Sequence, residues 1–163
     1  MQLIEEYRAL HRQRAYPGTT IVPHAGLIEK LIRRTGARTI LDYGCGAGTQ
    51  YTKLKIHRNW RVRMTLYDPA AKRWAAKPAG QFDGVLCTDV LEHVPEDEID
   101  GVAADLAGYA RLWCFATVCC RPAKKTFADG RNVHVTQRPL DWWRQRLAPA
   151  FAGGADLHLL ETP

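Results

Sequence analysis

The chain has 163 residues, of which 46% are hydrophobic and 25% are charged, and its formal net charge is +6. These values suit one globular domain with a sizeable apolar core, so no disulfide or metal is needed to hold it together. Acids near the N-terminus argue against a secretory signal peptide, and the longest apolar run is too short to cross a bilayer. The five cysteines form no CxxC pair and no metal-ligand spacing, so we expect a soluble, reduced, cytoplasmic protein with no membrane partner.

Helix and strand patterns alternate along the chain. Amphipathic helices are expected at 3–14 and 23–34, with Gly36 ending the second. Strands are expected at 39–43, 61–67, 82–88, 112–119 and 156–161, and further helices from Thr49 and at 69–76, 96–109 and 140–147. Near-continuous apolar strands alternating with helices predict an α/β fold, in which a mostly parallel sheet carries helices on both faces.

A glycine-rich turn follows the first expected strand. Asp42, Gly44, Gly46 and Gly48 stand at every second position. Glycines let a backbone approach a ligand closely, and the start of the following helix favours a negative group. The dinucleotide fingerprint G-x-G-x-x-G would need glycine at Thr49. A carboxylate beside this turn instead suits a ligand that carries an ammonium group.

Several polar segments fall at the carboxyl ends of the expected strands, where parallel sheets bind ligands. Besides the glycine turn they include Asp68, Thr88 with Asp89, and the chain from Val118 onward. Asp68 can accept hydrogen bonds from both ribose hydroxyls of a nucleoside. Its alternative role is to cap a helix that begins at Pro69.

Three motifs in this order resemble class I S-adenosylmethionine-dependent methyltransferases over about residues 39–118. Residues 41–48 are similar to the first motif, which wraps the methionine end of the cofactor. Tyr67 and Asp68 are similar to the second motif, whose acid takes the ribose hydroxyls. Residues 82–95 resemble the fourth-strand segment of the small-molecule branch. The resemblance implies a Rossmann-like fold, with S-adenosylmethionine as cofactor and S-adenosylhomocysteine as product.

The resemblance also implies a set of cofactor-binding residues at the strand ends. They are Asp42, Gly44, Cys45, Gly46, Gly48, Tyr67, Asp68, Pro69, Thr88, Asp89 and Val90. Only 13 residues separate Asp68 from Phe82, too few for the family's third strand and its helix. After the 140–147 helix the chain has one plausible strand where the family has an antiparallel pair. We therefore expect a shortened sheet, with the third strand and the terminal pair reduced.

We expect a single domain over 1–163, made of three parts. Residues 1–36 supply helices that cover the site, 37–120 form the cofactor-binding core, and 121–163 supply an acceptor loop, a helix and the last strand. Within the last part, 121–135 is expected to form a lid with Asn132 and His134 facing inward.

His93 is the best candidate for a general base, because its reference pKa is near neutrality, and Asp89 and His134 join it as catalytic candidates. The alternative is that His93 braces the next helix. Asp89, Glu92, His93 and His134 also resemble the metal-binding set of enzymes that methylate the terminal ribose of small RNAs, with Mg²⁺ or Mn²⁺. The favoured alternative is that His134 shapes the acceptor pocket without a metal, so we expect none.

The leading functional hypothesis is methyl transfer to an oxygen or nitrogen atom of a small molecule, with an anionic acceptor suggested by the basic charge. A basic stretch over 121–146 that contains Trp142 and Trp143 supports an RNA methyltransferase as an alternative. The alternative interpretation, without nucleic-acid binding, is a solvated surface with two core tryptophans. A non-catalytic cofactor-binding subunit is a third possibility, and a homodimer is compatible with all three.

Overall fold

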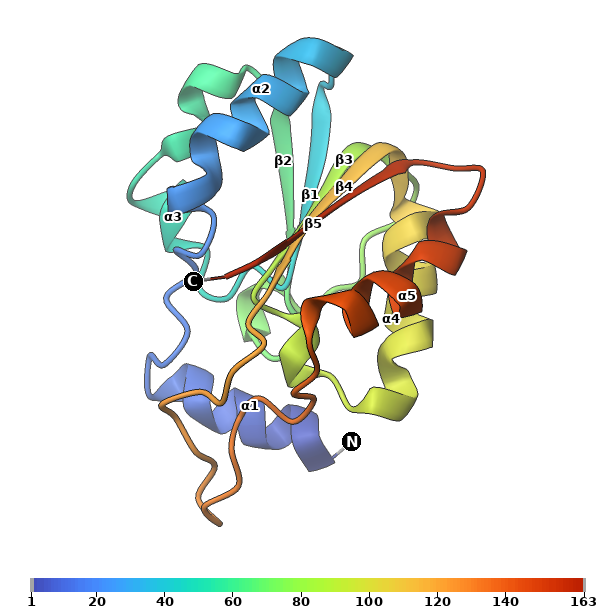
Figure 1. Ribbon diagram of the computed structural model, residues 1–163. Coiled ribbons are helices and arrows are strands. Elements are labelled where there is room, and N and C mark those ends of the chain that lie inside the picture. The colour runs from blue at the N-terminus through green and yellow to red at the C-terminus, as the bar shows by residue number, and fades with distance from the viewer. Residues whose placement is uncertain (1, 163) are drawn as a thin grey trace.

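A five-stranded parallel sheet organises the computed structural model, which describes residues 2–162 (Figure 1). Its strands are β1 (Thr39–Tyr43), β2 (Arg63–Tyr67), β3 (Phe82–Thr88), β4 (Ala110–Val118) and β5 (Asp156–Glu161). They lie in the order β2-β1-β3-β4-β5, so the chain turns one way from β1 to β2 and the other way to reach β3. The crevice beyond the carboxyl ends of β1 and β3 is therefore the topological switch point, where such sheets bind ligands.

The sheet confirms the expected Rossmann-like α/β fold in its shortened form. Among the described residues no strand lies between β2 and β3 in the chain, and β5 pairs with β4 in parallel. Three of the expected strands, 39–43, 82–88 and 156–161, have the bounds that the sequence predicted. No helix among residues 2–162 is long and apolar enough to span a membrane.

Helices cover both faces of the sheet (Figure 1). They are α1 (Gln2–Arg12), α2 (Ala25–Thr35), α3 (Thr49–Thr52), α4 (Ile99–Tyr109) and α5 (Leu140–Phe151). Figure 1 shows α2 and α3 on one face and α4 and α5 on the other, while α1 lies across one end of the molecule. Gly36 ends α2 in the left-handed conformation, as expected, with its N–H bonded to the carbonyl of Ile32.

The prediction of a helix at 69–76 was wrong. The segment holds only a 3-10 turn at Lys72–Trp74. Its polar groups fold back onto the end of β2, because the carbonyl of Trp74 accepts the N–H of Asp68 over 3.1 Å. The side chain of Asp68 accepts the N–H groups of Ala70 and Ala71, which are donors that the first turn of a helix leaves free, so this capping does not itself prevent a helix.

Side chains of β3 alternate between two apolar cores. Val85 packs into the core beneath α4 and α5, and Leu86 packs into the core beneath α2. Gly84 is required by the indole of Trp113, because a Cβ there would lie 2.3 Å from its Cζ2 atom.

A third apolar cluster lies outside the two main cores, and its buried members are Tyr7, Ala70, Phe127 and Val133. It joins α1 to the loop that follows β4. We call α1, residues 13–20 and residues 121–138 together the cap. The hydroxyl of Tyr7 bonds the carbonyl of Val133 and the carbonyl of His93, so the cap closes over the carboxyl end of β3.

Candidate active site

The glycine turn after β1 is built by close contacts that exclude side chains. Gly44, Gly46 and Gly48 have φ values of 88°, 57° and 66°. A Cβ on Gly44 would lie 2.2 Å from Cγ2 of Val90, which comes from the segment after β3. The turn therefore lies directly against the end of the neighbouring strand.

The start of α3 is not open to an anion at Ala47 and Thr49. The N–H groups of Ala47 and Thr49 donate to the carbonyls of Tyr16 and Pro17, each over 3.1 Å. Backbone oxygens of the cap therefore take the donors that a helix start would offer to a negative ligand. Sequence reasoning missed this contact, because no side-chain pattern marks it.

Asp42 lies beneath the turn and is 1% exposed. Its carboxylate accepts a hydrogen bond of 3.0 Å from Nε2 of Gln50, and Oε1 of Gln50 accepts the N–H of Ile21 over 3.1 Å. Burial raises the pKa of Asp42 to about 7. Through Gln50, Asp42 links the turn to the segment before α2. The side chain of Asp42 is not accessible to solvent.

Asp68 fills the capping role, which is one of the two that the sequence left open. Its Oδ1 accepts the N–H groups of Ala70 and Ala71 over 2.9 and 3.2 Å, which is the capping role. Its Oδ2 accepts the N–H of Gly46 over 2.9 Å and lies 3.7 Å from Nε2 of His11. A carboxylate has about four acceptor positions, so Asp68 keeps capacity for a ligand hydroxyl.

The other residues of the implied cofactor set also lie at these strand ends. The carbonyl of Tyr67 accepts the N–H groups of both Gly44 and Cys45. The hydroxyl of Thr88 lies 2.7 Å from that of Thr20, which links the end of β3 to the cap. The carbonyl of Pro69 accepts a hydrogen bond of 3.3 Å from the guanidinium of Arg8. Arg8 is in α1, so this carbonyl already has a partner within the protein.

Tyr16 is the part of the cap that packs against two histidine rings. Its ring centroid is 5.2 Å from that of His11 and 5.5 Å from that of His93. Its hydroxyl is buried and has no hydrogen-bond partner. Burial raises the pKa of Tyr16 to about 12, and the negative charges of Asp68 and Glu92 add to this effect.

His93 is held in one tautomer. Its Nδ1 lies 2.9 Å from the carbonyl oxygen of Val133, and because a carbonyl can only accept, the ring proton is on Nδ1 and Nε2 is free. Burial lowers the pKa of His93 to about 4, so the ring is neutral near pH 7. A neutral imidazole with a free Nε2 can accept a proton, but a pKa of about 4 makes His93 a weaker base than the near-neutral group that the sequence predicted.

Asp89 forms hydrogen bonds to the neighbouring strand ends and none to His93 among the described residues. Its φ of 54° is in the left-handed region, and its carboxylate accepts hydrogen bonds from the hydroxyls of Thr117 and Thr162. Asp89 therefore joins the ends of β3, β4 and β5.

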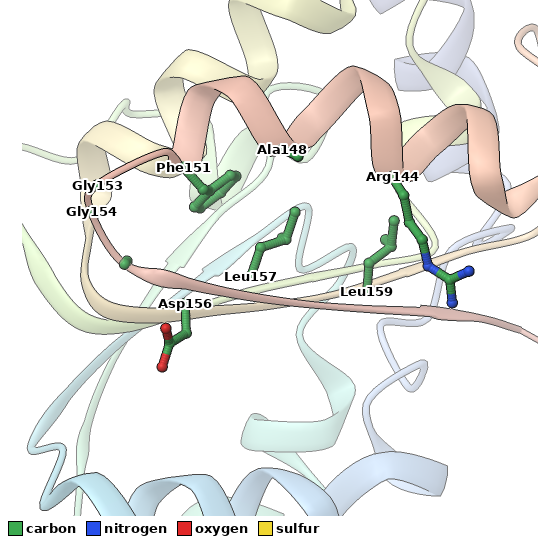
Figure 2. Close-up of a pocket in the computed structure, with 9 residues that line it drawn as sticks. Arg144, Ala148, Phe151, Gly153, Gly154, Asp156, Leu157 and Leu159 are labelled. Carbon is green, nitrogen blue, oxygen red and sulfur yellow. The ribbon is translucent and has the colours of Figure 1, made fainter.

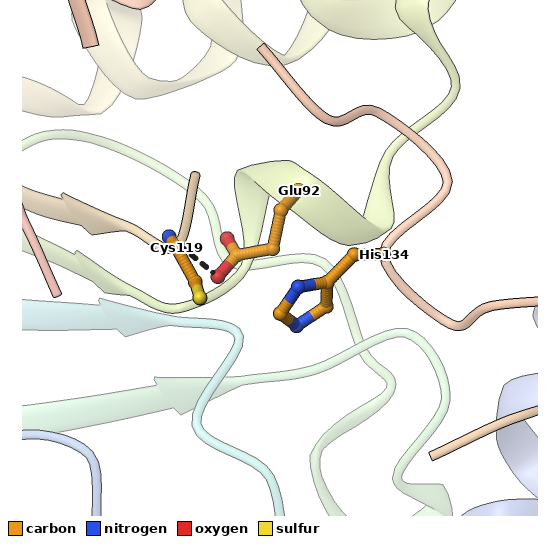
Figure 3. A group of neighbouring side chains, drawn as sticks. All are labelled: Glu92, Cys119 and His134. Carbon is orange, nitrogen blue, oxygen red and sulfur yellow. Dashed lines mark hydrogen bonds between the residues drawn. The ribbon is translucent and has the colours of Figure 1, made fainter. Parts of the chain in front are cut away.

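Glu92, Cys119 and His134 come together (Figure 3), and this group differs from the four ligands of the metal alternative that the sequence analysis did not favour. One ligand atom from each lies within 4.8 Å of the others, and neither Asp89 nor His93 belongs to the group. Glu92 is fully buried, with Oε1 accepting the N–H of Cys119 over 2.9 Å and Oε2 unpaired. Burial raises the pKa of Glu92 to about 8, and the nearby Asp89 adds to it.

The sequence analysis did not identify Cys119 as a site residue, because this cysteine is not part of a recognisable metal-ligand motif. The usable signal was its position just beyond β4, at the sheet edge that also holds Glu92. Asn132 was expected to face the site, but its side chain instead stabilises the loop by hydrogen bonds to the backbone. Its side chain accepts the N–H groups of Ala123 and His134 and donates to the carbonyl of Ala123.

A groove of about 480 Å³ between α5 and β5 lies outside this site (Figure 2). Arg144, Phe151, Leu157 and Leu159 are among the side chains that line it. None of the site residues predicted from the sequence borders it, so it carries no part of the proposed chemistry.

Comparison with known families matches residues 10–128 to a model described as a methyltransferase domain. The matched range includes the glycine turn, Asp68, His93 and Cys119, and ends before His134. No curated protein and no solved structure is significantly similar to the chain.

Proposed function

Because the chain belongs to this family of class I methyltransferases, whose cofactor is S-adenosylmethionine, we propose that it methylates an oxygen or nitrogen atom of a small molecule held beneath the cap. The observation that carries this proposal is the closure of the cap over the carboxyl ends of the strands. Tyr7 bonds the loop at Val133, and Phe127 packs on its ring with centroids 5.1 Å apart. A cap that covers the strand ends in this way suits a small acceptor better than a polymer.

The residues at the switch point fit the cofactor. The carboxylate of Asp68 supplies negative charge at the switch point for a ligand that is positively charged at sulfur and nitrogen, while Asp42 is buried beneath the glycine turn and holds its shape. The unpaired hydroxyl of Tyr16, close enough to Asp68 to feel its charge, lacks the partner that a buried polar group normally has. Asp68 would hold the ribose hydroxyls, and the glycine turn would allow close approach of the methionine end.

S-adenosylmethionine supplies a methyl group bound to a sulfonium sulfur, which is a good leaving group. The chain's main contribution is then to align the acceptor, an effect that can reach ~7–11 kcal/mol in favourable cases. Where the acceptor must lose a proton, Nε2 of His93 would take it, since this nitrogen is free and the ring is neutral. Tyr7 supports this role by bonding the backbone of His93 over 3.0 Å.

The basic residues of the C-terminal third favour a small acceptor over RNA, because several are already paired. Arg131 pairs with Glu6 and Asp129, and Arg138 pairs with Glu96. Such ion pairs reduce the free positive charge that phosphate binding needs. Lys125 remains near the site, where its ammonium lies 4.7 Å from the ring centroid of Tyr16, and this charge supports an anionic acceptor.

The test supplies S-adenosylmethionine with a labelled methyl group to the protein, together with cell extract separated into small molecules, RNA and protein. We expect label in the small-molecule fraction, and its loss in Asp68→Asn. Asp129→Asn, which removes an exposed carboxylate of the cap, is the matched control and should retain activity. Label in an RNA fraction that ribonuclease destroys would contradict the acceptor class. Absence of any heat of binding with the cofactor would contradict the whole proposal.

A further inference from the structure

The group formed by Glu92, Cys119 and His134 has no role in the proposed transfer of the methyl group. We propose that these three side chains bind one zinc ion and leave its fourth coordination position open (Figure 3). Metal binding here stands apart from the methyl transfer proposed above, so either can fail alone.

The three side chains come from different parts of the fold and turn toward one another. Glu92 lies in the 3-10 turn after β3, Cys119 follows β4, and His134 belongs to the cap. Their ligand atoms lie within 4.8 Å of one another. Zinc bonds of about 2.0–2.3 Å place tetrahedral ligands roughly 3.5 Å apart, so the group needs to contract by about 1 Å. Cys119 and His134 are in irregular segments that can make this adjustment.

The backbone holds the ligands together before an ion binds. The carbonyl oxygen of Arg121 lies 2.6 Å from Nδ1 of His134 and 3.7 Å from Sγ of Cys119. The N–H of Cys119 donates to Glu92 over 2.9 Å. Outer hydrogen bonds of this kind orient the ligands of metal sites.

An unpaired carboxyl oxygen is the independent sign of a ligand. Glu92 is fully buried and its Oε2 has no hydrogen-bond partner. A buried polar group without a partner is costly, and most such groups in folded proteins are satisfied. A cation held by Glu92 would provide the missing partner.

The donor set selects the metal. One carboxylate, one thiolate and one imidazole are the ligand types of zinc, whereas Mg²⁺ and Ca²⁺ prefer oxygen ligands only. Three protein ligands are typical of sites whose fourth position takes water or a substrate. The ring of His134 lies 4.9 Å from that of His93, so if the proposed function holds, an acceptor oxygen on the ion would lie beside the general base.

The experiment titrates chelator-treated protein with Co²⁺, which replaces zinc and gives a thiolate charge-transfer absorption band when a cysteine is bound. We expect the band in the wild type, its displacement by Zn²⁺, and its absence in Cys119→Ala. Cys120→Ala is the matched control, because Cys120 is the adjacent, partly exposed thiol outside the group, and it should keep the band.

Loss of an outer partner costs about 10–100-fold in metal affinity, so loss of the ligand Cys119 or His134 should weaken Zn²⁺ binding by about 100-fold or more. Cys119→Ala should bind S-adenosylmethionine like the wild type, and this separates a failed metal site from a failed methyltransferase. The proposal is overturned if the wild type shows no thiolate band, or if Cys119→Ala retains it.

Discussion

The hydroxyl of Tyr7 lies 2.7 Å from the carbonyl oxygen of Val133, a residue 126 positions later in the chain. This bond fastens α1 to the loop after β4 and also reaches the backbone of His93. Closure of the site therefore depends on a contact between distant parts of the sequence.

Tyr7→Phe removes that bond and leaves the ring in place. We expect the free energy of unfolding to fall by about 1 kcal/mol, the usual net value of one hydrogen bond, and KM for the acceptor to rise as the cap loosens. Urea unfolding and steady-state kinetics measure the two effects. Tyr109→Phe is the control, since it removes a comparable bond to Pro78 far from the cap. Equal KM changes in both variants would contradict a specific role for Tyr7.

Gly44→Ala tests the close contact between the glycine turn and the end of β3. The added Cβ would lie 2.2 Å from Val90, and a φ of 88° strains any residue with a side chain. We expect a loss of about 1–2 kcal/mol in stability from backbone strain alone, and weaker binding of S-adenosylmethionine by calorimetry. Gly101→Ala is the control, because nothing lies within 4 Å of its added Cβ in α4 and alanine favours a helix by up to about 1 kcal/mol. Unchanged cofactor affinity in Gly44→Ala would remove the turn from the binding site.

Asp42 should make the stability of the free protein depend on pH. Burial raises its pKa from an ordinary 3.8 to about 7, so between these values the folded protein keeps a proton that the unfolded chain releases. The free energy of unfolding should therefore fall as the pH rises from about 4 to 7, by up to roughly 4 kcal/mol for this group alone.

Asp42→Asn cannot ionise and should lose that part of the pH dependence. Urea unfolding of both proteins at pH 5 and pH 8 measures the difference between their slopes. The other titrating groups are common to both proteins and cancel in this comparison. Identical slopes would mean that Asp42 is already ionised at pH 5 in the folded state.

The sheet was predictable because its central strands are largely apolar and buried. Phe82 to Thr88 is buried at every position, and a run of this kind with a turn on each side has few alternatives. The 69–76 segment was not, because its apolar residues fit a helix while the chain instead turns back so that the carbonyl of Trp74 accepts the N–H of Asp68. Local hydrogen bonds of this kind leave little trace in a hydrophobic pattern.

The site was predictable where it depends on strand ends and not where it depends on the cap. The glycine turn and Asp68 follow directly from β1 and β2. In contrast, Tyr16 and Cys119 lie in irregular segments. The course of such segments cannot be predicted from a periodic pattern of apolar residues. The sequence therefore placed the cofactor residues at one edge but could not show which rings Tyr16 contacts there.

Tyr16 provides a test in which stability and activity should change in opposite directions. Its hydroxyl is buried without a partner, so Tyr16→Phe removes an unsatisfied group and should leave the free energy of unfolding unchanged or raise it by about 1 kcal/mol. If the hydroxyl serves the bound state, cofactor affinity or turnover should fall in the same variant. Tyr43→Phe is the control, because its hydroxyl donates to Asp105 over 3.4 Å and its loss should lower stability slightly without affecting turnover. A Tyr16→Phe protein with wild-type affinity and turnover would assign Tyr16 to the packing of the cap alone.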